Sequence, residues 1–127
     1  MGYYSNVRLV VSKKGYKALS QYVRNYLGPH QLDNNLLRNA DFKKKTSYGY
    51  AFGWNDIKWY QGDEEYYKDV NAMMSGIKYL TNKNLSFNFV KVGQDYDDYE
   101  EIYNDGENID LPFPTLDRSF DDSNLDI

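Results

Sequence analysis

Two segments with helical periodicity lie between segments with strand periodicity, and this order restricts the fold of the 127-residue chain more than any other feature. Residues 3–11 place apolar side chains on one face by alternation, as in a half-buried strand. Ser12 is a suitable helix N-cap, and residues 13–27 repeat apolar side chains at helical spacing until Gly28 and Pro29 end the pattern. The start of the chain therefore predicts a strand followed by a helix.

The rest of the chain extends this alternation. It predicts a strand over 48–54, a short strand over 57–60, a helix over 61–80 and a strand over 85–92. The complete order (strand, helix, strand, strand, helix, strand) predicts an α+β fold of the ferredoxin-like split βαβ type, an antiparallel sheet with two helices on one face. Residues 99–103 form either a fifth, edge strand or an irregular acidic arm. The path of residues 30–45 is left open.

A single domain is expected over residues 1–127, because a chain of this length suits one core. We expect a compact α/β core over about 3–104 and an acidic, extended C-terminal segment over about 105–127, with residues 121–127 frayed. The chain starts without the basic and apolar pattern of a signal peptide, and its apolar runs are far shorter than the ~20 residues that span a bilayer. A soluble, cytoplasmic protein is the expectation.

Charge is distributed unevenly along the chain. Residues 1–94 contain 14 Lys and Arg against 7 Asp and Glu, an excess of +7, whereas residues 95–127 contain 1 Arg against 12 Asp and Glu, an excess of −11; together they give the net charge of −4. Such a division predicts either a charged surface that binds a partner or two segments that neutralise each other. The sequence leaves both interpretations open.

Few residues are suited to enzyme chemistry. The chain has no Cys for a disulfide, a zinc site or a thiol nucleophile, and its single His, His30, lies in a predicted loop without a recognisable catalytic partner. An EF-hand alignment of the acidic region puts Tyr103 and Pro112 at positions that need carboxylates. The sequence therefore predicts a non-enzymatic protein with no cofactor and no metal site. A metal-dependent hydrolase or nuclease built on clustered carboxylates is a minor alternative.

The acidic region interleaves tyrosines with carboxylates directly after the predicted strand over 85–92. Tyrosine supplies contact area at low entropic cost, and carboxylates attract a basic partner over long range. We predict that this surface binds a basic protein, with carboxylates standing in for nucleic-acid phosphates; an edge strand here could also pair across a homodimer axis. The predicted protein-binding residues are Asp95, Tyr96, Asp97, Asp98, Tyr99, Glu100, Glu101, Tyr103, Asp105 and Glu107.

A sheet that binds single-stranded nucleic acid is the alternative interpretation. Aromatic residues of the predicted strands, among them Phe52 and Phe87, would form a platform on which bases stack. The RNP-type motif of such sheets is absent, and the acidic region would repel phosphates. The candidate nucleic-acid-binding residues are Lys43, Lys44, Lys45, Tyr48, Tyr50 and Lys58.

A family resemblance rests on four stretches: MGYYSNVRLVVSKKGYKAL, FGWNDIKWY, VNAMMSGIKYL and FNFVKVGQDYDDYEE. Their spacing and aromatic content resemble small uncharacterised proteins encoded by phages and prophages of low-GC Gram-positive bacteria, over most of residues 3–120. The resemblance implies an accessory phage protein acting in the cytoplasm of the bacterial host. By analogy it implies an inhibitor of host machinery or host defence, such as an anti-CRISPR protein. The partner would then be a basic host or phage protein, for example a nucleic-acid-binding effector.

Overall fold

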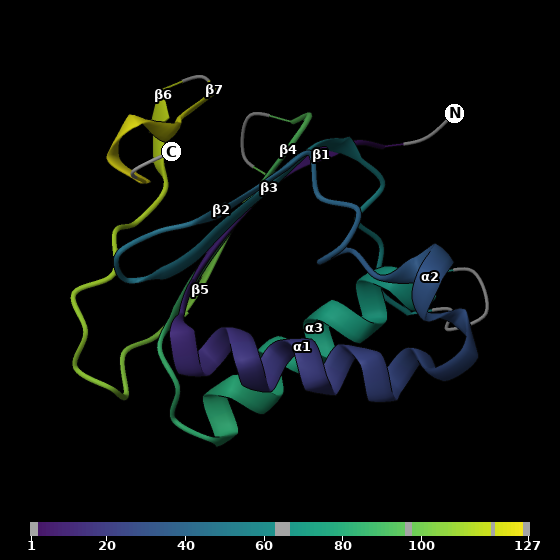
Figure 1. Cartoon of the computed structure of the whole chain (residues 1–127). Coiled ribbons are helices and arrows are strands. Elements are labelled where there is room, and N and C mark those ends of the chain that lie inside the picture. Colours follow the sequence, from purple (N-terminus) through teal and green to yellow (C-terminus); the bar gives the residue numbers. More distant parts are fainter. Residues whose placement is uncertain (1–2, 63–66, 96–97, 118, 126–127) are drawn as a thin grey trace.

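The computed structural model describes residues 3–62, 67–95, 98–117 and 119–125 (Figure 1). A five-stranded sheet forms the centre of the molecule, in the order β2-β3-β1-β4-β5, and every neighbouring pair is antiparallel. The strands are β1 (Ser5–Ser12), β2 (Phe42–Lys45), β3 (Gly49–Ile57), β4 (Phe87–Gly93) and β5 (Tyr99–Asn104). β2 and β5 therefore form the two opposite edges of this sheet.

Two long helices, α1 (Lys13–Leu27) and α3 (Lys68–Asn82), pack against each other on one face of the sheet, as Figure 1 shows. α1 begins where predicted, because the Ser12 hydroxyl accepts a hydrogen bond from the Gly15 N–H at 3.0 Å. It ends at Gly28, whose φ of +53° favours glycine. The short helices η1 (Gly28–His30) and α2 (Gln31–Asn34) then lead towards β2.

A continuous apolar core lies between the helices and the sheet. Alternate residues of β1 point into it, and the Phe52 and Trp54 rings of β3 stack there with their centroids 5.8 Å apart. The buried residues that β1, β4 and the helices contribute are Val7, Leu9, Val11, Phe87, Phe89, Leu19, Val23, Met73, Ile77 and Leu80. Burial of each such large side chain contributes about 1.5–3 kcal/mol, so this core dominates the stability of the fold.

The other face of the sheet is covered by C-terminal residues. There Val10 and Ala51 pack against Leu111 and Leu125. The last part of the chain forms a two-stranded sheet of β6 (Thr115–Asp117) and β7 (Ser119–Asp121), followed by η2 (Asp122–Leu125). Figure 1 shows this yellow segment on the side of the sheet opposite to the helices. The acidic end of the chain is therefore part of the packed structure.

The predicted α+β class and the antiparallel sheet are confirmed, and of the two alternatives left open for residues 99–103 the structure shows the edge strand, β5. The predicted strand over 57–60 is wrong, because β2, within the stretch whose path was left open, pairs with β3 instead. Gly53 explains this pairing: a Cβ at Gly53 would lie 2.1 Å from a ring carbon of Phe42. The small residue of β3 thus accommodates a ring from its neighbouring strand.

Two boundaries also differ from the prediction. α3 begins at Lys68 rather than near residue 61, and residues 63–66 lie outside the described part of the chain. The predicted fraying of the C-terminus is wrong for residues 122–125, which form η2 and end in the fully buried Leu125. A buried leucine anchors the chain end because its apolar surface is removed from water.

Candidate interaction surface

The β5 ridge, defined as Tyr99, Glu101, Tyr103 and Phe113, follows one edge of the sheet. β5 pairs with β4 on one side, and no strand in the described ranges pairs with its other side. The first three residues alternate along β5 and so share a face, while the Phe113 ring meets the Tyr103 ring edge-on at 5.4 Å. Tyr99, Tyr103 and Phe113 are 47%, 63% and 40% exposed. The ridge thus combines an open strand edge with three solvent-facing rings.

Tyr99 holds the Glu101 carboxylate of this ridge in place. The Tyr99 hydroxyl donates a hydrogen bond to the Glu101 carboxylate. This hydrogen bond, with partial burial and the charge of Glu101, raises the pKa of Tyr99 to about 12. On the other face of β5, Glu100 lies 4.0 Å from Lys91 Nζ, and an ion pair this exposed contributes little. Both carboxylates therefore remain available to a partner.

The turn before β5 is built around Tyr3. Its hydroxyl oxygen accepts a hydrogen bond from the Asp95 N–H at 2.9 Å. That N–H lowers the pKa of Tyr3, but the hydrogen bond to the Asp98 carboxylate and the nearby negative charges outweigh it, so the pKa is raised. The turn needs Gly93, because a Cβ there would lie 2.0 Å from Asp98 Oδ2. The Asp98 carboxylate is consequently bound within the molecule.

Two more carboxylates bond to the scaffold after β5. Glu107 Oε2 accepts hydrogen bonds from the Ser86 N–H at 2.8 Å and from the Ser12 hydroxyl, at the N-terminus of α1. Asp105 Oδ1 accepts hydrogen bonds from the Ser86 hydroxyl at 3.1 Å and from the Ile109 N–H at 2.9 Å. A carboxylate beside the positive end of a helix is stabilising. Residues 105–107 are therefore fastened to the start of α1 and of β4.

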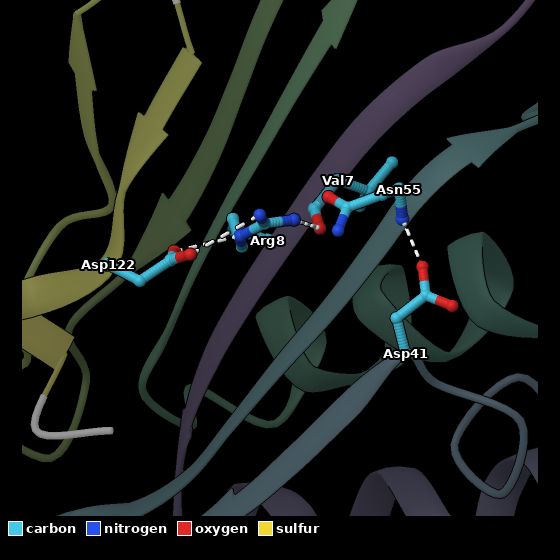
Figure 2. Close-up of polar contacts among 5 residues, drawn as sticks. All are labelled: Val7, Arg8, Asp41, Asn55 and Asp122. Carbon is cyan, nitrogen blue, oxygen red and sulfur yellow. Dashed lines mark hydrogen bonds and ion pairs between the residues drawn. The ribbon is translucent and has the colours of Figure 1, made fainter.

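Arg8 joins the C-terminal segment to the second face of the sheet, as Figure 2 shows. Its Nε donates to Asp122 Oδ1 at 2.9 Å, and its Nη1 donates to the Val7 carbonyl at 3.0 Å. The guanidinium lies 5.1 Å from the Phe42 ring centroid and 4.5 Å from that of Phe120. Because the Arg8 side chain is only 6% exposed, Asp122 is the group that compensates its charge.

The structure divides the predicted protein-binding residues by what their side chains contact. Those whose side chains are exposed on or beside β5 and do not bond to the described scaffold outside β4 and β5 are Asp95, Tyr99, Glu100, Glu101 and Tyr103; Asp105 is also exposed but bonds to Ser86 and Ile109. Asp98, Asp105 and Glu107 bond within the molecule, and Tyr96 and Asp97 lie outside the described residues. Phe113 was not predicted. An aromatic residue between two prolines in a polar stretch was the available signal.

The predicted base-stacking platform is wrong in its geometry. Phe52 and Phe87 are fully buried beneath the helices, and the Tyr50 ring lies against the Tyr16 ring with centroids 4.0 Å apart. Tyr48 does not share their face: it lies in the tight turn before β3, and its hydroxyl donates to the Leu125 carbonyl at 2.9 Å. The helices thus occupy the face on which bases would have to stack.

The lysines proposed for that platform lie at separate places. Lys43, Lys44 and Lys45 are exposed on β2, and Lys43 Nζ donates to the Tyr16 hydroxyl at 2.8 Å. Lys58 follows β3, with its Nζ 5.7 Å from the Tyr4 ring centroid. The basic residues of β2 therefore mark the edge of the sheet that lies opposite to the β5 ridge.

Other kinds of site have little support in the described part of the chain. No three His, Asp or Glu side chains among those residues are grouped so that they could hold a metal ion. His30 is exposed at the end of η1 and borders a hollow of about 300 Å³ with Tyr26, Leu27 and Lys68. None of the described helices is long and apolar enough to cross a membrane.

Comparisons with protein-family models, with curated proteins and with solved structures give no match to this chain. The resemblance to phage proteins therefore stays a prediction. The described geometry defines the class: an α+β protein whose antiparallel sheet ends in an open, acidic and aromatic edge.

Proposed function

We propose that this protein is a non-enzymatic binding protein that engages a basic protein partner through the β5 ridge. One observation carries the proposal: of five exposed large hydrophobic side chains among the described residues, three (Tyr99, Tyr103 and Phe113) stand together beside Glu101. Exposed rings grouped with charge are typical of interaction sites. The other two exposed hydrophobic side chains, Leu32 and Tyr4, lie singly on other parts of the chain and need no such explanation.

The proposed mode of binding uses the open edge of β5. An extended segment of the partner would pair with the free backbone groups of this strand, as in β-strand addition. Basic side chains at adjacent positions of that segment would then meet Glu101 on one face of β5 and Glu100 on the other, because neighbouring residues of a strand point to opposite faces. Carboxylates in this row could replace the phosphates that such a partner otherwise binds.

A hollow beside the ridge supports an arginine as the anchor of the partner. It measures about 210 Å³, and its lining includes Tyr103, Phe113, Asp105 and Asp110. A guanidinium can stack on an aromatic ring while it donates to a carboxylate. Asp110 is exposed, and Asp105 keeps an oxygen beyond the Oδ1 that bonds within the molecule. The hollow suits one planar cationic side chain.

Two finer assignments belong to the same proposal. The order β2-β3-β1-β4, with both crossovers passing through helices on one face, supports a ferredoxin-like split βαβ topology to which β5 is added. The resemblance to phage proteins would place the protein in the cytoplasm of a bacterial host, with a host defence or nucleic-acid-binding effector as the basic partner. A homodimer through two β5 edges is a further possibility, because β5 is unpaired on that side in the described chain.

The test compares capture of a partner by two variants of equal charge. The immobilised protein is exposed to a lysate of a low-GC Gram-positive bacterium, and proteins eluted by salt are identified. Glu100→Gln with Glu101→Gln should weaken binding of the captured protein at least tenfold, since both carboxylates face the proposed partner segment. Asp33→Asn with Asp56→Asn is the matched control, because both side chains are exposed on other elements and Asn tolerates the φ of +51° at Asp56.

A third variant separates charge from aromatic contact. Tyr103→Ala leaves the net charge unchanged but removes the ring that lines the hollow. We expect it to weaken binding while the salt dependence stays the same. Equal loss of binding in the two charge variants would instead show that total charge alone attracts the partner, and the ridge would lose its role.

A further inference from the structure

A second surface, on the opposite edge of the sheet, has the reverse charge. A hollow of about 490 Å³ opens between α1, α2 and β2; we call it the α1–β2 groove. Four basic side chains line it: Lys17 and Arg24 from α1, Arg38 after α2, and Lys43 from β2. The other lining residues are neutral: Tyr16, Ser20, Gln21, Gln31, Asn35 and Leu37. Four cations therefore converge on one hollow without a carboxylate in its lining.

The charges of the groove are not neutralised within the described molecule. The ion pairs among the described residues join Arg8 to Asp122 and Lys91 to Glu100, and none involves a groove residue. Like charges that share a hollow repel one another and raise its positive potential, so an anion that enters is favoured. No carboxylate of the described residues lines the groove, so the groove is open to an external anion.

The β5 ridge is too far away to neutralise the groove. β2 and β5 are separated by four strand spacings, about 19 Å at roughly 4.8 Å per spacing. That distance is about two Debye lengths at physiological ionic strength, over which charges at the surface are largely screened. The net negative charge of the chain therefore does not prevent binding of an anion at this edge.

Several groove side chains are already held in position. Lys43 Nζ donates to the Tyr16 hydroxyl at 2.8 Å and lies 4.9 Å from the centroid of the same ring. The buried Asn35 accepts a hydrogen bond from the Leu37 N–H through Oδ1 at 3.0 Å, and its carbonyl accepts one from the Arg38 N–H at 3.0 Å. This turn fixes the backbone that carries Arg38. Less ordering is required on binding when the groups are preorganised.

Residues of α1 form one wall of the groove. Ser20 and Gln21 lie three and four residues after Lys17, and Arg24 lies three and four residues after Gln21 and Ser20, so all four residues lie along one side of the helix. Two arginines supply planar forks of N–H donors that match phosphate oxygens, and two lysines supply mobile point charges. The side chains of Ser20 and Gln21 add neutral donors. A hollow of this size accommodates a ligand of nucleotide dimensions.

We propose that the α1–β2 groove binds a phosphate-bearing ligand, either a free nucleotide or the backbone of single-stranded nucleic acid. Phosphate is an anion whose oxygens can accept from the two arginine forks and the two lysines at once. The site does not depend on stacking at the buried face of the sheet. It is also independent of the protein partner proposed for the β5 ridge.

The test measures binding of defined probes by fluorescence anisotropy and calorimetry: ATP, inorganic tripolyphosphate, a ten-nucleotide oligo-dT and a poly-glutamate peptide. If all four cations contact phosphates of oligo-dT, its affinity should fall about 50-fold between about 50 and 200 mM salt. Tight binding of ATP and tripolyphosphate identifies a nucleotide site, whereas preference for oligo-dT identifies a strand site. Equal binding of poly-glutamate would overturn the assignment to phosphate.

Two variants of equal charge locate the site. Arg24→Gln with Arg38→Gln should lower affinity at low salt at least tenfold and reduce the salt dependence to about 7-fold over the same range, because two phosphate contacts remain. Lys13→Gln with Lys14→Gln is the control, since both lysines are exposed at the start of α1 and neither lines the groove. Equal losses in both variants would overturn the proposal.

A measurement on the unsubstituted protein tests the proposal even if the variants fail to fold. Titration of the ¹⁵N-labelled protein with the tightest phosphate probe should shift the amide signals of Lys17, Gln21, Arg24 and Arg38. Signals of β5 should stay in place. Shifts confined to β5, or no binding of any phosphate probe below 1 mM at low salt, would overturn the proposal.

Discussion

The carboxylates that follow β4 fall into two groups with different surroundings. Glu107 and Asp122 each accept two hydrogen bonds from the domain, through serine and backbone donors or through Arg8. Glu100 and Glu101, on β5, face solvent and contact only Lys91 and the Tyr99 hydroxyl. The first group fastens the C-terminal segment to the sheet, whereas the second group stays exposed on β5, where we propose that a partner binds.

The difference between these two groups of carboxylates shows that the opposite charge excesses of residues 1–94 and 95–127 do not predict which charged side chains form ion pairs. The acidic end is bound mainly by neutral donors and by a single buried arginine. The lysines of β2 stay at the far edge of the sheet. Opposite charge is thereby kept at the two edges instead of being neutralised. We call Glu107 and Asp122 the bound group, and Glu100 and Glu101 the open group. Substitutions in the bound group should lower the free energy of unfolding, whereas substitutions in the open group should weaken binding of a partner.

The largest effect on stability is expected at Asp122. Asp122→Ala leaves Arg8 buried without a counter-charge, and breaking a buried pair from one side costs about 3 kcal/mol. Urea denaturation followed by circular dichroism should show this loss of unfolding free energy. Combining Asp122→Ala with Arg8→Met should restore most of it, because methionine can fill the space between the Phe42 and Phe120 rings without a charge. A loss below 0.5 kcal/mol would mean that Asp122 belongs with the open group.

A smaller effect is expected at Glu107. Glu107→Ala removes both hydrogen bonds of its carboxylate and leaves the Ser86 N–H without that acceptor, at a cost of about 2 kcal/mol. Glu107→Gln keeps an oxygen in place and should lose roughly half as much. The same denaturation experiment with Glu100→Gln provides the contrast, with a change within about 0.5 kcal/mol for an exposed pair. Similar losses at Glu107 and Glu100 would remove the distinction between the two groups.

The periodic parts of the fold could be read from the sequence, and the parts fixed by single contacts could not. α1 and β4 were predicted closely, because their apolar side chains alternate with helical or strand period over many residues. β2 was missed since its FKKK stretch has no apolar face of its own. It becomes a strand only because Phe42 fits over Gly53. Such a pairing between distant residues leaves no local pattern.

The candidate surface was predictable in outline for a similar reason. The sequence placed Tyr99, Glu101 and Tyr103 in an acidic, tyrosine-rich segment and left open whether it is an edge strand or an irregular arm; the shared face of the three side chains follows once β5 is a strand. Which carboxylates bond internally depends on Ser12 and Ser86, which lie far from Glu107 in the sequence. The contact of Phe113 with Tyr103 and the meeting of Arg24, Arg38 and Lys43 in one groove likewise require the folded chain.

The smallest expected effect is on the pKa of Tyr99, which reports directly on its contact with Glu101 in the open group. Its pKa is raised to about 12 because its hydroxyl donates to Glu101, so Glu101→Gln should lower the pKa of Tyr99 towards 10. A raised pKa favours the folded state below pH 10, and this contribution disappears as the pH rises from about 10 to 12. It is small because Tyr99 is nearly half exposed.

Titration of ¹³Cζ-labelled tyrosine signals measures the shift, with Glu100→Gln as the control on the opposite face of β5. If Tyr99 titrates alike in both variants, Glu101 is not held by it, and the ridge lacks the fixed carboxylate that the proposed partner would bind.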